Sequence, residues 1–120
     1  MTPVRVAVVG LGYWGPNLVR NLFELDSAEV VLVCDRSPEA LAQTTRRYPS
    51  VRGTTSFSDV LDDTSVEAVV IATPIGTHLE LARAVLESGR HALVEKPLAH
   101  SVAGALELAA LASARSLVLV

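Results

Sequence analysis

Short apolar runs alternate with longer segments of helical periodicity along the whole chain. The first run covers residues 4–9, is rich in valine and stops at Gly10, which is the pattern of a buried β-strand. Apolar residues between Leu18 and Leu25 then recur at helical spacing, and Pro16 is tolerated in the first turn of that helix. The alternation continues to the last residue and predicts further strands at 29–35, 52–55, 66–71, 91–94 and 117–120.

Several residues mark where helices begin and end. Ser37 before Pro38 predicts a helix with a hydroxyl N-cap and proline at its first position. Thr77 and Glu80 match a capping box, and Gly89 is well placed to end the helix that they start. We also expect a short helix at 58–61 and an alanine- and leucine-rich helix at 101–115.

A regular strand–helix alternation is typical of a doubly wound parallel sheet with a three-layer α/β/α architecture. The chain has 120 residues, so we expect residues 1–120 to form one domain. Half of the residues are hydrophobic and most of these are valine, leucine or alanine, which suits valine-rich parallel strands covered by helices.

Charge and cysteine content narrow the classes of partner. The formal net charge is −3, and the Arg46–Arg47 pair is too small to form a basic patch, so the sequence disfavours nucleic-acid binding. The uncharged stretch 6–19 is broken by glycine and proline, which excludes a membrane span and makes a poor secretory signal. Cys34 is the single cysteine, so no intramolecular disulfide can form, and we expect a reducing, cytoplasmic location.

The first strand leads into a glycine-rich turn with the spacing G-x-G-x-x-G. Gly10 would permit the tight turn, Gly12 would let the backbone approach a pyrophosphate, and Gly15 would let the helix pack close to the strand. Asp35 follows Gly15 by 20 residues at the end of the second expected strand, where dinucleotide-binding proteins place an acidic residue. The candidate phosphate site is therefore the helix start together with this turn, which also contains Leu11, Tyr13 and Trp14.

Asp35 and Arg36 bear on the choice of dinucleotide. A carboxylate at position 35 can accept hydrogen bonds from the adenosine ribose hydroxyls and would repel a 2′-phosphate, so NAD is expected and NADP is possible. Arg36 could face a 2′-phosphate or stack on adenine, or it could be a solvated loop residue.

Two more segments fall at the ends of expected strands, where open parallel sheets bind ligands. One is Ala72-Thr73-Pro74, which leads to His78, and the other is Glu95-Lys96-Pro97. Lys96 could hydrogen-bond a ribose or assist proton transfer, or it could be a surface lysine. His91 and His100 read as structural residues, and the spacing of the three histidines matches no metal site.

Taken in order, G-L-G-Y-W-G-P-N, V-C-D, A-T-P-x-x-x-H and V-E-K-P-L-A resemble the Gfo/Idh/MocA family of NAD(P)-dependent oxidoreductases. The resemblance implies hydride transfer between a nicotinamide and a hydroxyl-bearing carbon of a sugar, nucleotide sugar or cyclitol. By the same resemblance, Lys96 is the active-site lysine, Pro97 follows a cis peptide, and Thr73, Pro74 and His78 line the nicotinamide side.

Members of that family continue into a second α/β domain that supplies most of the substrate pocket. This chain stops within an apolar segment, so we expect a cofactor domain that binds NAD without turning over substrate alone. We also expect it to associate with further copies of itself, because the missing domain would leave apolar surface uncovered.

Three other interpretations of the glycine turn compete with this one. A methyltransferase turn is usually G-x-G-x-G, whereas the third glycine here comes one residue later. A short-chain dehydrogenase needs a Tyr-x-x-x-Lys pair, but Asn17 and Arg52 stand four residues after Tyr13 and Tyr48. A non-catalytic dinucleotide sensor remains open as the alternative function.

Overall fold

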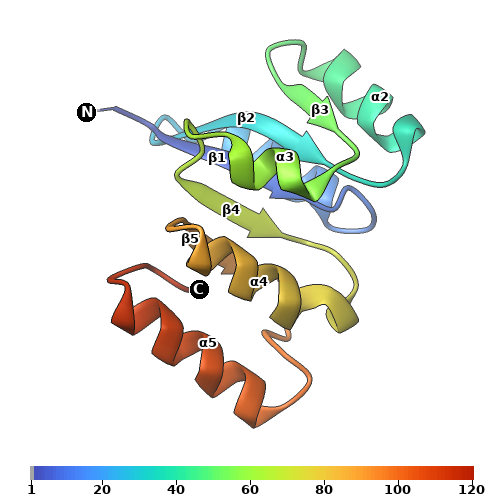
Figure 1. Ribbon diagram of the computed structural model, residues 1–120. Coiled ribbons are helices and arrows are strands. Elements are labelled where there is room, and N and C mark those ends of the chain that lie inside the picture. The colour runs from blue at the N-terminus through green and yellow to red at the C-terminus, as the bar shows by residue number, and fades with distance from the viewer. Residues whose placement is uncertain (1) are drawn as a thin grey trace.

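A computed structural model describes residues 2–120 and contains a five-stranded parallel sheet (Figure 1). Its strand order is β3-β2-β1-β4-β5, so β1 lies at the centre and the chain leaves it first toward one edge and then toward the other. The strands are β1 (Val4–Val9), β2 (Ala28–Cys34), β3 (Arg52–Thr54), β4 (Ala68–Ile71) and β5 (His91–Val94). The predicted doubly wound parallel sheet is confirmed.

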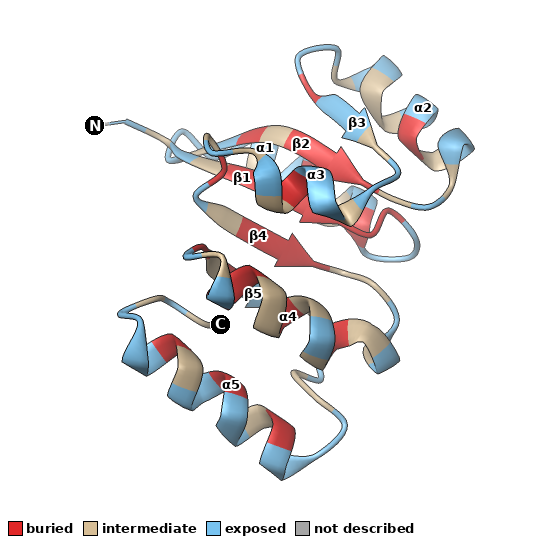
Figure 2. Cartoon of the chain, in the orientation of Figure 1, coloured by how far each residue is buried: buried red, intermediate tan, exposed pale blue. Residues whose placement is uncertain are grey.

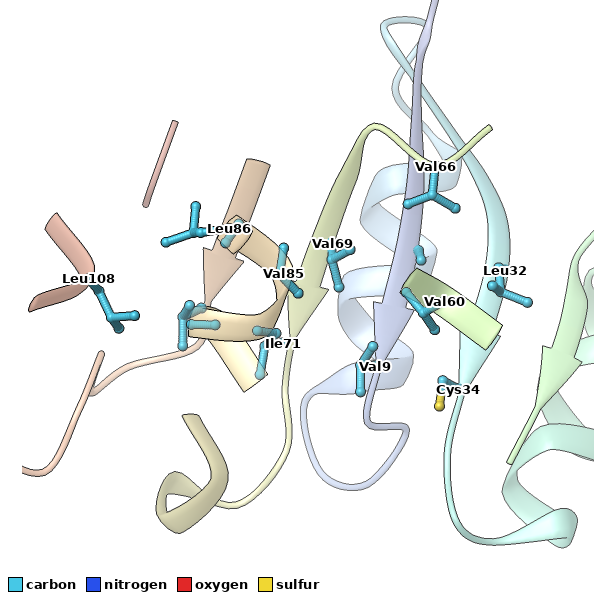
Figure 3. Packing of buried hydrophobic residues seen from close by; sticks show 14 of the residues in the cluster. Val9, Leu32, Cys34, Val60, Val66, Val69, Ile71, Val85, Leu86 and Leu108 are labelled. Atoms are coloured by element: carbon cyan, nitrogen blue, oxygen red, sulfur yellow. The ribbon is translucent and has the colours of Figure 1, made fainter. Parts of the chain in front are cut away.

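Helices cover both faces of the sheet, and the valine alternation within β1 decides which helices meet which face. Val6 and Val8 pack in one apolar cluster with α1 and α2. Ala7 and Val9 pack in a second cluster with α3, α4 and α5, and Figure 3 shows this second cluster. The buried residues accordingly concentrate in the strands and on the inner sides of the helices (Figure 2). The helices are α1 (Gly15–Phe23), α2 (Pro38–Arg47), α3 (Phe57–Asp62), η1 (Ile75–Thr77), α4 (His78–Glu87) and α5 (Val102–Ala114).

Most of the predicted helix ends are confirmed, and one is wrong. The Ser37 hydroxyl caps α2 by accepting from the N–H of Ala40 at 3.2 Å, and Gly89 follows α4 with a φ of +86°. The capping box predicted from Thr77 and Glu80 does not form, because the Thr77 hydroxyl makes no bond to the N-terminal turn of α4. The Thr77 hydroxyl is instead engaged with the preceding turn.

The last predicted strand is reduced to a short edge segment. Residues 117–120 run alongside β5 but form a single parallel bridge, between Ala92 and Leu119. Hydrogen bonds from the N–H of Ala92 to the Val118 carbonyl and from the N–H of Val120 to the Ala92 carbonyl, each 3.0 Å, hold this segment at the edge of the sheet. His91 is structural as predicted, since its Nδ1 accepts from the N–H of Val118 at 3.0 Å.

The glycine turn packs at the point where the chain connections diverge, between β1 and β4. Gly10 has a φ of +99°, and a Cβ there would lie 2.7 Å from the backbone carbonyl carbon and oxygen of Ala72. A Cβ on Gly15 would run into the carbonyl group of Gly10. The backbones of β1, α1 and the segment after β4 therefore meet without intervening side chains.

No helix in the described part of the chain, residues 2–120, is both long enough and apolar enough to cross a membrane.

We expect Gly15→Ala to lower the free energy of unfolding by about 1–3 kcal/mol, because α1 must move away from the Gly10 carbonyl group. The matched control is Gly12→Ala, whose added Cβ meets nothing within 4 Å and should change stability by about 0.5 kcal/mol at most. Urea unfolding followed by circular dichroism measures both variants. Equal stability of the two would show that the contact between α1 and β1 is not tight.

Candidate functional site

The carboxyl ends of all five strands lie along one edge of the sheet because the strands are parallel, and a cleft of about 780 Å³ follows this edge. The cleft gathers most of the residues singled out in the sequence, from loops far apart along the chain. Those that line it are Gly10, Gly12, Tyr13, Trp14, Asp35, Arg36, Thr73, Pro74, Thr77, His78, Glu95 and Lys96. Leu11, Gly15 and Pro97 lie next to the cleft rather than in its lining.

The lining also includes residues that the sequence analysis missed. Thr55 follows β3 directly, and Phe57 begins α3 beside it. The rule that ligand sites lie after strand carboxyl ends would have indicated Thr55, but β3 has only three residues and gives a weak signal.

The glycine turn presents unused hydrogen-bond donors to the cleft. Within residues 2–120, the backbone N–H groups of Gly12, Tyr13 and Trp14 donate to no protein acceptor. The first turn of α1 carries no acidic side chain, so the positive end of the helix dipole is not neutralised locally. Free N–H groups at a helix start form an anion site, and the open space over Gly12 leaves room for a phosphate to approach.

Asp35 joins the glycine turn to the loop after β2. The N–H of Leu11 donates to Asp35 Oδ2 at 2.6 Å, and the N–H of Ser37 donates to Oδ1 at 2.8 Å. These two bonds fix the carboxylate in position. Each carboxylate oxygen can accept more than one hydrogen bond, so Asp35 still has acceptor capacity for ligand hydroxyls.

Cys34 lies directly before Asp35, is buried in the apolar cluster that Figure 3 shows, and also lines the cleft. Burial, together with the negative charges of Asp35 and Asp59, raises the pKa of its thiol to about 11. The thiol is therefore protonated at neutral pH and acts as a small apolar side chain rather than a nucleophile.

Thr73 and Thr77 form a hydroxyl pair at the turn after β4. Thr77 Oγ1 donates to the Pro74 carbonyl at 2.7 Å, and the oxygens of Thr73 and Thr77 lie 2.6 Å apart. Because a hydroxyl has one hydrogen, Thr73 is the donor within the pair. Thr77 does not cap α4 because its backbone is helical, with φ −103° and ψ −8°, whereas an N-cap residue is extended. The hydroxyl pair leaves Thr73 Oγ1 free to accept from a ligand.

Lys96 and His78 both border the cleft, but they differ in exposure. Lys96 is exposed, and the bond between Lys96 and Pro97 is cis, as the resemblance implied. His78 is only 1% exposed, and both of its ring nitrogens face protein carbonyl oxygens. Of the two, only Lys96 presents a free titratable group to the cleft.

Two aromatic rings stand on the glycine turn. Tyr13 is 85% and Trp14 51% exposed, and their rings meet edge to face with centroids 5.1 Å apart. Both line the cleft, so they form its aromatic wall on the side of α1.

Comparison with known proteins identifies the fold that carries this site. A family model described as an oxidoreductase family with an NAD-binding Rossmann fold matches residues 4–120. The chain belongs to the Gfo/Idh/MocA family. The match covers the glycine turn, Asp35 and the Glu95-Lys96-Pro97 segment, so the family resemblance and the predicted NAD-binding Rossmann domain are confirmed.

Among curated relatives, inositol 2-dehydrogenase of Mycolicibacterium gilvum is 36% identical over 110 residues, covering 91% of this chain and 32% of that protein. GenD2 from gentamicin A biosynthesis, solved in complex with NAD, has a TM-score of 0.94 and 37% identity, over 99% of this chain and 34% of that one. Biliverdin reductase from Synechocystis, solved with biliverdin and NADP+, has a TM-score of 0.92 and 30% identity, over 98% of this chain and 37% of that one. The chain spans about a quarter to a third of the length of the first curated relatives that it matches.

Proposed function

We propose that this chain binds NAD as the cofactor domain of an oxidoreductase. The enzyme would transfer hydride between the nicotinamide and a hydroxyl-bearing carbon of a sugar, nucleotide sugar or cyclitol. The observation that carries the proposal is that the glycine turn, Asp35 and Lys96 lie on one cleft at the point where the sheet connections diverge.

Different residues of the cleft contact different parts of the cofactor. The N–H groups of the glycine turn hold the pyrophosphate, and Asp35 accepts from the adenosine ribose hydroxyls. When bound, the nicotinamide supplies the hydride chemistry. Thr73 and Lys96 border the part of the cleft on the β4 and β5 side, where Lys96 is placed to exchange a proton with a substrate hydroxyl.

The substrate class is supported by relatives rather than by contacts in this chain. The inositol 2-dehydrogenase relative is named for a cyclitol. Lys96 is exposed, and residues 2–120 offer no second wall that would enclose a substrate against it. We therefore propose that the enclosing wall comes from a further domain, as the greater length of the relatives suggests.

Self-association also stays a prediction. Val102 and Leu106 on α5 are 76% and 64% exposed, and Val120 at the sheet edge is 70% exposed. Apolar side chains of this size favour association when nothing covers them.

Gly12→Val tests the phosphate site directly. A side chain at position 12 would project into the space that the pyrophosphate needs, so NAD affinity should fall by more than about 100-fold, or about 3 kcal/mol. Calorimetric titration with NAD measures the affinity of both proteins. Because a Cβ at this position meets no protein atom within 4 Å, the variant should melt at the wild-type temperature. Unchanged affinity in a folded Gly12→Val protein would contradict the phosphate site.

Asp35 should set the preference for NAD over NADP. In the wild type we expect NAD to bind more tightly, because the carboxylate would repel a 2′-phosphate. Asp35→Asn keeps the side-chain shape, removes the charge and retains one of the two acceptor oxygens, and it should reduce the preference for NAD over NADP by about tenfold. Asp35→Ala should in addition weaken both cofactors, since the N–H groups of Leu11 and Ser37 lose their acceptor. A wild-type preference for NADP would identify Arg36 as the stronger determinant.

We expect the chain alone to bind NAD without turnover. A reacting carbon must be held against the nicotinamide with a base in reach and water excluded, and Lys96 at an open rim meets only one of these conditions. The assay follows reduced nicotinamide absorbance with a panel of sugars and cyclitols, and Lys96→Ala is the matched control. Saturable turnover that disappears in Lys96→Ala would show instead that these residues form a complete enzyme.

A further inference from the structure

His78 is a buried polar side chain that the proposed function does not use. It is the first residue of α4 and is 1% exposed. Its Nε2 lies 2.7 Å from the carbonyl oxygen of Thr73, and its Nδ1 lies 2.8 Å from the carbonyl oxygen of Pro97. The ring therefore bridges the segment after β4 and the segment after β5.

This bridge lies just beyond the end of the sheet. The last ladder bond between the two segments runs from the N–H of Glu95 to the Ile71 carbonyl, at 2.8 Å. After that bond, within residues 2–120, the backbones of 72–77 and 96–100 share no direct hydrogen bond. The imidazole of His78 thus provides the hydrogen-bonded connection between the turn that carries Thr73 and the turn that carries Lys96.

The two acceptors determine how each ring nitrogen of His78 can bind. Both are backbone carbonyls, which accept and cannot donate. A doubly protonated ring donates to both carbonyls, whereas a neutral ring donates to one of them. When both nitrogens donate, each of them holds one segment, and a side chain that replaces only one nitrogen should release only the other segment.

We propose that His78 is a positioning residue that holds Lys96 at a fixed distance from Thr73 by bridging the carbonyls of Thr73 and Pro97. The importance of this spacing for catalysis rests on the proposed function, in which Lys96 exchanges a proton with the substrate and Thr73 borders the same part of the cleft. The bridge itself rests on the geometry of His78 alone.

Two isosteric substitutions each remove one of the two hydrogen bonds that His78 makes to Thr73 and Pro97. In His78→Gln, the amide nitrogen takes the place of Nε2 and can still donate to Thr73, but the bond to Pro97 is lost. In His78→Asn, the amide nitrogen takes the place of Nδ1 and can still donate to Pro97, but the bond to Thr73 is lost. His78→Leu removes both bonds while keeping an apolar side chain of similar size.

Backbone ¹⁵N relaxation of the chain provides a readout that general destabilisation would not reproduce. His78→Gln should lower the order parameter of the Lys96 N–H from about 0.85 to below about 0.6 and leave Thr73 unchanged. His78→Asn should do the reverse, and His78→Leu should lower both. Each variant should also raise the dissociation constant for NAD about three- to tenfold.

A measurement on the wild type keeps the proposal falsifiable if a variant fails to fold. Ring N–H protons of His78 held by carbonyls should exchange with water much more slowly than those of the exposed His100. Exchange as fast as that of His100 would overturn the bridge. Order parameters that stay unchanged in all folded variants, or that fall equally at both segments in His78→Gln and His78→Asn, would also overturn it. Failure of the wild type to bind NAD would contradict the proposed function and leave the relaxation test of the bridge intact.

Discussion

The close approach of three backbones at the centre of the sheet is the constraint on which the rest of this structure depends. Gly10 turns with a positive φ against Ala72, and Gly15 brings the first turn of α1 against the carbonyl group of Gly10. No side chain separates β1, α1 and the segment after β4 at this point. As a result, the glycine turn, with the N–H groups of Gly12, Tyr13 and Trp14 that are unpaired within residues 2–120, lines the same cleft as Thr73 and Lys96.

Polar groups at the cleft serve the fold and the site together. The Asp35 carboxylate organises two loops through backbone N–H groups while keeping acceptor capacity for a ligand. The Thr73–Thr77 hydroxyl pair fixes the turn after β4 and leaves one oxygen open to the cleft. Substitutions at such positions affect binding through loop geometry as well as through direct contact, which is why isosteric variants separate the two effects better than alanine does.

Much of the fold was predictable because the signals are local. A valine-rich run that ends at glycine located β1 at its observed residues, and the short run 91–94 located β5 likewise. Ser37 and Gly89 marked helix ends correctly. Errors arose where the neighbouring structure, rather than the local sequence, decides the backbone conformation. Thr77 has the sequence of a capping residue, yet it ends the η1 turn with a helical φ of −103° and ψ of −8° instead of the extended conformation of an N-cap. The segment 117–120 has the composition of a strand, but at the sheet edge it pairs on one side only and forms a single bridge.

The sequence by itself determined the alternating α/β order, the glycine turn and the acidic residue that indicate a dinucleotide site, because each depends on spacing along the chain. Only the tertiary structure decided how these residues are used. It buried His78 between two carbonyls at the border of the cleft, and it fixed Asp35 to the N–H of Leu11. Both outcomes depend on contacts between segments 19 to 24 residues apart, which are brought together by the parallel packing of the strands and cannot be read from local periodicity.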